Sequence, residues 1–252
     1  MKKIISFTLF LVFCFLFLIS PVHASYPQSY SDYQFQYSQY RLAYQNYQIA
    51  KSAFLTYKTL STQNEALEKM RHTLLKRTDV LTAYLTLIWE KMAITESLDK
   101  ETANAFQGIA QKEQAWLTDN QKKISAASNM ADLNTAADEF TSRHSQISKE
   151  ANLGITQILF AKTNLTYSKS GDFFGRVSET LSRLENLGED TTFYRRGLSS
   201  AQAKADLYLD KKEAAGKETE LIRTQKTLQE GLEYIRESTN NLKEILNTIT
   251  GL

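Results

Sequence analysis

The sequence predicts an all-α protein, arranged as an elongated antiparallel helical bundle or coiled coil of five to six helices. Three observations indicate this class. Apolar residues recur at alternating steps of three and four along most of the chain. No proline follows Pro27, and the commonest residue types favour helix over sheet. At about 1.5 Å per residue the longest helices would exceed about 50 Å, so we expect a rod rather than a globule.

The first 24 residues have the pattern of a secretory signal peptide. Two lysines precede an apolar run from Ile4 to Ile19, and Ala24 is a small residue at the expected cleavage position. We therefore expect export to the cell envelope or extracellular space, with cleavage after Ala24. One alternative is an uncleaved membrane anchor, for which the run is slightly short. Another is a lipid attached to Cys14.

Charge and cysteine content exclude several functional classes. Cys14 is the one cysteine of the chain and leaves with the signal peptide, so no disulfide framework or thiolate site is expected. Removing Lys2 and Lys3 leaves 28 basic against 28 acidic residues. A nucleic-acid partner is not expected, because such proteins usually carry a basic excess. Membrane contact is expected only through an uncleaved N-terminal segment.

Residues 25–60 form the segment around which the rest of the chain is organised. A helix is expected from about Ser31 to Leu60, capped at its start by Ser29 or Ser31. Because residues 25–40 are mostly Tyr, Ser and Gln, disorder through Tyr37 is the alternative. The aromatic residues of this helix fall on one heptad seam, which is our candidate packing or partner-binding site: Tyr30, Tyr33, Tyr37, Tyr40, Tyr44, Tyr47 and Phe54.

Residues 61–252 are expected to form one domain of long helices. A capping box of Thr62 and Glu65 predicts a second helix that runs to about Ser97. Asp99 should cap a third helix, and Asn129 a fourth. The apolar face of the second helix is wider than a two-stranded seam, which favours a bundle of several helices.

Glycines set the expected helix ends in the C-terminal half. The fourth helix is expected to close at residues 168–171, and a short helix to run from Asp172 to a left-handed Gly188. The last and longest helix should start at residues 190–192. A bend or break is expected in it at residues 211–217, where apolar residues thin out.

The sequence contains no recognisable catalytic constellation. His72 and His144 are far apart and lack partners at metal-ligand spacing. No phosphate-binding loop or nucleophile motif is present. We expect no enzymatic activity, no cofactor and no metal.

The expected function is therefore a non-enzymatic structural or partner-binding role. The tyrosine seam is expected either to pack in the core or to bind a protein partner, including a second copy of this chain. Two alternatives stay open. A glycan or cell-wall polymer could stack on the rings. A membrane-active, pore-forming-like protein could hide the apolar run Ile155 to Ala161 in its core, although that run is too short to span a bilayer.

Overall fold

The protein is all-α in a computed structural model that describes residues 26–250. The predicted signal peptide, its cleavage site and Cys14 lie outside this range. The described residues form six helices and no strand: α2 (Tyr26–Tyr57), α3 (Leu60–Ala93), α4 (Lys100–Ala126), α5 (Met130–Asn186), α6 (Thr192–Gly216) and α7 (Leu221–Thr250).

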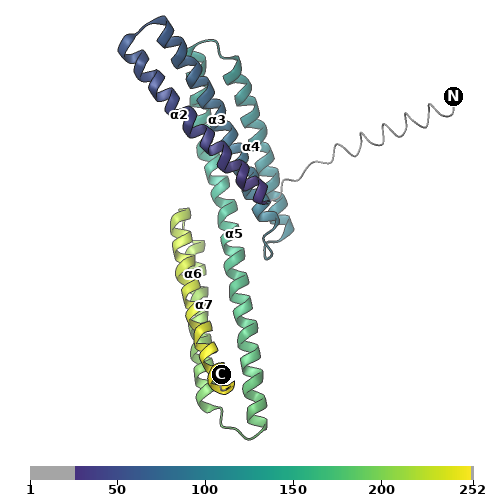
Figure 1. Cartoon of the computed structure of the whole chain (residues 1–252). Coiled ribbons are helices and arrows are strands. Elements are labelled where there is room, and N and C mark those ends of the chain that lie inside the picture. The colour runs from purple at the N-terminus through teal and green to yellow at the C-terminus, as the bar shows by residue number, and fades with distance from the viewer. Residues whose placement is uncertain (1–25, 251–252) are drawn as a thin grey trace, which may run out of the picture.

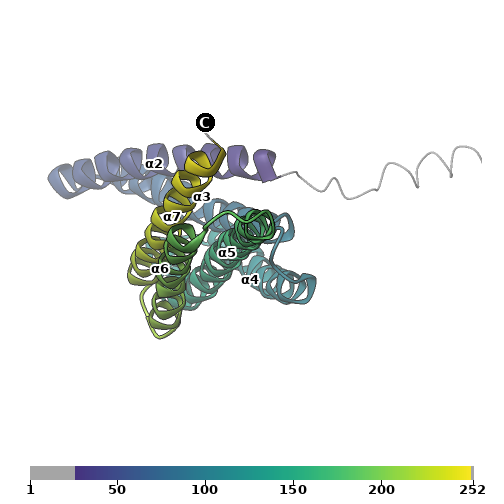
Figure 2. The ribbon, with the colours of Figure 1, turned by 90° about the horizontal axis from the view of Figure 1, so that it is seen from below.

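Helix α5 runs through both halves of the molecule (Figure 1). The helices α2, α3 and α4 lie beside its N-terminal half, and α6 and α7 lie beside its C-terminal half. Its 57 residues make it about 85 Å long at 1.5 Å per residue. Seen from below, α2 forms the outer layer on α3 (Figure 2). Among the described helices, the α2 backbone approaches only α3.

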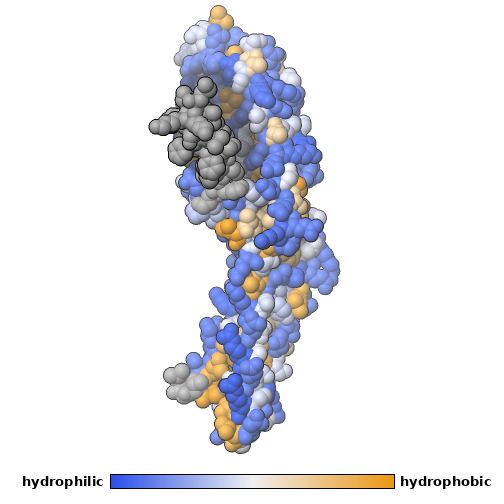
Figure 3. All heavy atoms as spheres, turned by 90° about the vertical axis from the view of Figure 1, so that its right-hand side faces the viewer, coloured by the Kyte–Doolittle hydropathy of each residue, from blue (hydrophilic) through white to orange (hydrophobic). Residues whose placement is uncertain are grey.

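Two separate zones of buried apolar side chains stabilise the two halves. The first joins α3, α4 and α5 and consists of two clusters. One contains Leu85, Phe106, Phe140 and Ile147, each at most 2% exposed, and the other surrounds Met70. The second joins α5, α6 and α7 around Val177. The outer surface is mostly hydrophilic, and hydrophobic atoms gather at the end where α5 turns into α6 (Figure 3).

The tyrosine-rich segment is helical from its first described residue. Helix α2 begins at Tyr26, so the expected start at Ser31 and the alternative of disorder through Tyr37 are both wrong. Ser29 is not a cap but a buried residue within the helix. Pro27 fits because the first turn of a helix needs no backbone N–H donor. The helix ends before Lys58, whose φ of +51° is left-handed.

The predicted caps are correct for two of the four helices for which one was named. Asp99 accepts a hydrogen bond from the Thr102 amide at 2.7 Å, and Asn129 accepts from the Asp132 amide at 3.0 Å. The capping box of α3 is formed by Thr59 and Thr62, three residues before the expected Thr62 and Glu65. Helix α3 also ends at Ala93 rather than near Ser97.

The expected break at residues 168–171 does not exist, because α5 continues through it to Asn186. An added Cβ at Gly171 or Gly175 would meet nothing within 4 Å, so neither glycine marks a tight contact. A mid-helix glycine costs only about 1 kcal/mol relative to alanine. Burial of Phe174, Val177 and Leu181 against α6 and α7 offsets that cost.

The C-terminal segment forms two helices rather than one, and neither is the longest of the described helices. Helix α6 ends at Gly216 and α7 begins at Leu221, next to the stretch where a bend or break was expected. Gly188 has the predicted left-handed conformation, with a φ of +87°. Within residues 26–250, no helix combines the length and the hydrophobicity that crossing a bilayer requires.

Candidate functional site

The aromatic residues of α2 lie in two columns with different environments. Tyr33, Tyr40, Tyr47 and Phe54 are spaced by seven residues and are half-buried. Tyr30, Tyr37 and Tyr44, also spaced by seven, are 46–47% exposed. The predicted single seam is therefore split into an inner and an outer column, because the two columns differ by about 50° around a heptad helix.

The inner column pairs with one column of α3 that runs in the opposite direction. The Tyr33 ring lies 5.3 Å from the Tyr84 ring. One heptad toward the N-terminus of α2 and one toward the C-terminus of α3, the Lys91 ammonium lies 4.2 Å from the centre of the Tyr26 ring. Moving seven residues toward the C-terminus of α2 thus corresponds to moving seven residues toward the N-terminus of α3.

The same register continues toward the other end of α2. Arg77, the next member of the α3 column, lies with its guanidinium 3.9 Å from the centre of the Phe140 ring of α5 and is close enough to Tyr40 to interact with it electrostatically. Tyr47 packs on the buried cluster that contains Met70. The Thr73 hydroxyl donates across the interface to the Ala43 carbonyl at 3.0 Å, and Ala43 is 2% exposed. Alternation of small residues with rings lets the two backbones approach closely.

Rings of the outer column contact rings of the inner column. Tyr37 stacks on Tyr33 at 6.1 Å, and Tyr44 contacts Tyr40 at 6.2 Å between ring centres. Burial raises the pKa of Tyr33, and the neighbouring Tyr37 and Tyr30 raise it further. Burial, with Tyr33 as a smaller cause, also raises the pKa of Tyr84. The Tyr33 and Tyr84 hydroxyls therefore stay protonated and neutral, and they add no charge to the contact between α2 and α3.

Helix α2 is unusual among the described helices in how few charges it carries. Its 32 residues include three charged side chains, Asp32, Arg41 and Lys51. It also exposes a second column at spacing seven, in which Phe35 is 59%, Leu42 53% and Ile49 69% exposed. By contrast, α7 is slightly shorter and carries a charged residue about every fourth position.

The sequence reasoning missed several exposed apolar residues of α2, which lie on a different side of the helix from Tyr30, Tyr37 and Tyr44. Phe35, Leu42 and Ile49 were not singled out, although they repeat at the same spacing as the tyrosines. The partners Tyr84 and Lys91 were also missed. The sequence signal for Tyr84 and Lys91 was Arg77, a charged residue in an otherwise apolar seam. Arg77 shares the heptad position of Tyr84 and Lys91. A ring of a facing helix stabilises a cation at a seam position, as Tyr26 of α2 does for Lys91 and Phe140 of α5 does for Arg77.

The remaining candidates are packed in the interior or lie on the surface. His144 stacks on Phe140 at 6.0 Å, and burial, followed by the nearby Arg77, lowers its pKa. His72 is exposed on α3. In the run from Ile155 to Ala161, Ile158 and Ala161 are buried, and Ile158 belongs to the cluster that joins α3, α4 and α5. Within the described part of the chain, no three His, Cys, Asp or Glu residues gather where a metal ion could bind.

No protein family matches this chain, and no curated protein or solved structure is detectably similar to it. The functional argument therefore rests on the surface of α2 alone.

Proposed function

We propose that this chain is a non-enzymatic, exported helical protein that binds a protein partner, or a second copy of itself, through the outer surface of α2. In this proposal the six helices act as an elongated antiparallel bundle with coiled-coil-like pairing between α2 and α3. The N-terminal signal-peptide pattern supports the export, and the cell envelope or extracellular space is the expected location.

The observation that carries the proposal is an exposed, nearly uncharged aromatic surface on one helix. Tyr30, Tyr37 and Tyr44 are each almost half exposed, and the rings of Tyr37 and Tyr44 contact rings of the inner column. Protein interfaces are enriched in tyrosine and depleted of charged residues at their centres. Rings that are already ordered lose little conformational entropy on binding, which favours affinity.

The first experiment measures self-association by sedimentation equilibrium. A variant with Tyr30, Tyr37 and Tyr44 all changed to Ser is compared with the unaltered chain, and a matched control carries Leu187→Ser and Phe193→Ser. Those two control residues are each 78% exposed at the distant α5–α6 turn. If the second copy is the partner, the unaltered chain and the control are dimers, and the triple variant is a monomer.

The second experiment detects a different protein partner. A photo-crosslinking phenylalanine analogue replaces Tyr37 in the producing cells, and the control position is Ile222, which is 80% exposed on α7. A discrete adduct at Tyr37 that is absent at Ile222 supports the proposal. A monomer in the first experiment, together with no adduct specific to Tyr37 in the second, refutes it.

The glycan-binding alternative rests on the same exposed rings, since sugars stack on exposed aromatic faces. Its test is retention on cell-wall or polysaccharide material, with Tyr37→Ala and Tyr44→Ala as variants and Ile222→Ala as control. Unchanged retention in the tyrosine variants would remove this alternative.

A further inference from the structure

The outer column of α2 continues beyond its tyrosines to a lysine. Lys51 follows Tyr44 at the same spacing of seven residues that separates Tyr30, Tyr37 and Tyr44. The Lys51 side chain is exposed, and it forms none of the hydrogen bonds or ion pairs found in residues 26–250. From its N-terminal to its C-terminal end, the column therefore presents three neutral rings and then one free cation.

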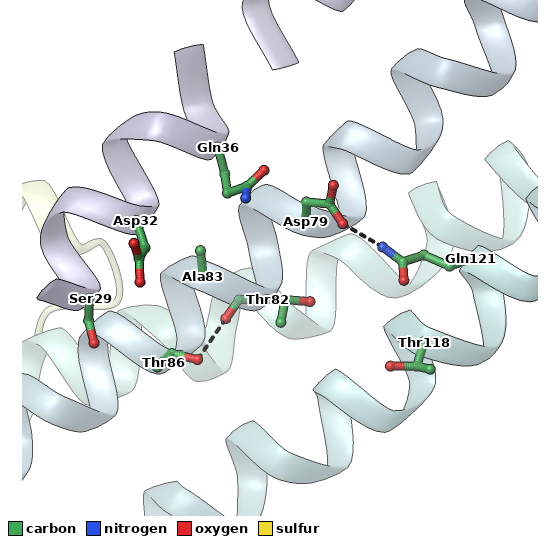
Figure 4. A pocket seen from close by; sticks show the side chains of 9 residues that line it. All are labelled: Ser29, Asp32, Gln36, Asp79, Thr82, Ala83, Thr86, Thr118 and Gln121. Atoms are coloured by element: carbon green, nitrogen blue, oxygen red, sulfur yellow. Dashed lines mark hydrogen bonds between the residues drawn. The ribbon is translucent and has the colours of Figure 1, made fainter. Parts of the chain in front are cut away.

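The described helices leave this column uncovered. Its three tyrosines are 46–47% exposed, and among the described helices the α2 backbone approaches only α3. Ser29 and Gln36 each lie about 100° around the helix from the tyrosine that follows them, and they line a polar groove together with residues of α4 (Figure 4). Helix α4 and the outer column thus lie on different sides of α2, and the column is open to a helix from another molecule.

The contact between α2 and α3 shows how the rings of α2 pair with a facing helix. The two helices are antiparallel, and the contact joins the Tyr33 ring to the Tyr84 ring and, one step of seven residues away, the Tyr26 ring to the Lys91 ammonium. A cation is stabilised over a ring, whereas a second cation opposite it costs energy. A partner that suits the outer column should therefore place rings opposite the tyrosines and a ring opposite Lys51.

We infer that the outer column pairs with the outer column of a second copy of this chain, with the two α2 helices antiparallel. A two-fold axis between residues 40 and 41 places Tyr30 opposite Lys51 of the second copy, and Tyr37 opposite Tyr44 of the second copy. The symmetry repeats both contacts, so each chain covers the free cation of the other with a ring. Parallel pairing would instead place Lys51 opposite Lys51. This inference rests on the proposed function, because it names the partner of the same surface.

The size of this contact suits a dimer that dissociates on dilution. The six tyrosines of two outer columns are each about half exposed, so together they would bury about 600 Å². Specific interfaces begin at about 1,000 Å² in total, which requires neighbouring positions to be covered as well. The exposed Gln34 and Gln48 are such positions, because the same axis brings Gln34 of one copy close to Gln48 of the other.

The first test measures the dissociation constant of the dimer by sedimentation equilibrium. Lys51→Gln should raise it about tenfold, because each dimer loses two contacts between a cation and a ring. Lys51→Arg keeps the cation and should keep the affinity. The matched control Lys112→Gln, on an exposed position of α4, should leave the affinity unchanged. Arg41→Gln should tighten the dimer, because Arg41 lies beside its own copy at the axis. An unchanged constant in Lys51→Gln, or an equal rise in Lys112→Gln, overturns the inference.

The second test determines the orientation of the two helices with a short bismaleimide crosslinker. Every variant carries Cys14→Ser, so that the introduced thiol is the one thiol of the chain. A mixture of Gln34→Cys and Gln48→Cys chains should form crosslinked dimers. Gln34→Cys alone should not, because its two thiols lie about 20 Å apart along antiparallel helices. Ile222→Cys, at a position 80% exposed on α7, is the control for random collisions.

The outcomes separate this inference from the proposed function. A dimer in which Gln34→Cys chains crosslink to each other is parallel, which overturns the inference and leaves α2 as the binding surface. A monomer that forms an adduct with a different protein at Tyr37 also overturns only the inference. A monomer with no adduct specific to Tyr37 overturns both. Helix content measured by circular dichroism shows whether each variant is folded.

Discussion

The ring of Tyr33 lies 5.3 Å from the ring of Tyr84, at an interplanar angle of 37°. This pair sets the register of α2 on α3, because the contacts of Tyr26 with Lys91 and of Tyr47 with the Met70 cluster follow at steps of seven residues. A helix with few aliphatic residues is thus held by a regular series of ring contacts. The same contacts hold the outer tyrosines in place.

The two tyrosine columns should differ in their effect on stability. We expect Tyr33→Ala to lower the free energy of unfolding by about 2 kcal/mol, because it removes a half-buried ring and its aromatic partner. Tyr37→Ala should cost less than about 1 kcal/mol, since its ring is 46% exposed. Urea unfolding followed by circular dichroism measures both. Equal costs would contradict the division into inner and outer columns.

Two glycines of α5 provide a matched test of its continuity. Gly171→Ala should stabilise the protein by about 1 kcal/mol, because the residue is helical and an added Cβ meets nothing within 4 Å. Gly154→Ala should destabilise it, because the Cβ would lie 2.7 Å from Phe106 and 2.8 Å from Ile88. Thermal unfolding gives both signs. A destabilising Gly171→Ala would show that the helix breaks there after all.

The ion pair between Glu113 and Arg143 should be costly to break from one side. Glu113 is 3% exposed, and Arg143 binds its carboxylate through two hydrogen bonds of 2.6 and 2.8 Å. Arg143→Ala leaves a buried charge without a partner, so we expect a loss of about 3 kcal/mol. Adding Glu113→Gln to that variant should restore part of the loss, because the remaining side chain is neutral.

The control for this prediction is the exposed pair of Lys122 and Asp119. Lys122→Ala should leave stability almost unchanged, because solvent screens that pair. A cost for Arg143→Ala no greater than that for Lys122→Ala in urea unfolding would refute the prediction.

Stability should fall in mildly acidic solution because of His144. Burial and the nearby Arg77 lower its pKa in the folded chain, so the unfolded chain takes up a proton first as the pH falls below about 6.5. The stability that His144 contributes by staying neutral is fully present above that pH. It is lost as the pH falls toward the pKa that His144 has in the folded chain. His144→Gln should reduce the difference between the unfolding midpoints measured at pH 7.5 and at pH 5.5. The same slope in His144→Gln as in the exposed control His72→Gln would contradict this origin.

The helical class and most of the buried positions follow from heptad spacing alone. Two of the four predicted caps are correct, because Asp99 and Asn129 directly precede apolar periodic segments. The break predicted at Gly171 fails for a tertiary reason: burial of Phe174 and Val177 against helices distant in sequence keeps the helix intact. Spacing also cannot show that Thr59, rather than Thr62, starts α3, since both are threonines and the choice depends on Lys58 adopting a left-handed conformation.

The candidate surface was predictable only in part. Spacing identifies which rings share a heptad, but the exposure of Tyr30, Tyr37 and Tyr44 depends on which neighbour α2 packs against. The polar groove between α2, α3 and α4 (Figure 4) was not predictable, because Asp32 and Gln121, which line it, are nearly ninety residues apart and neither belongs to a motif. Only the placement of α2 and α4 on different sides of α3 brings them to one cavity.

Helix α5 belongs to both buried zones, and the described helices α2, α3 and α4 make no backbone approach to α6 or α7. The two ends of the molecule are therefore connected by the continuous hydrogen-bonded backbone of α5. Loss of order at either end frays this shared helix up to the point where the other zone holds it. Amide exchange along α5 should accordingly be slow within each zone and fastest between them, so that the molecule melts as two cooperative units joined by one helix.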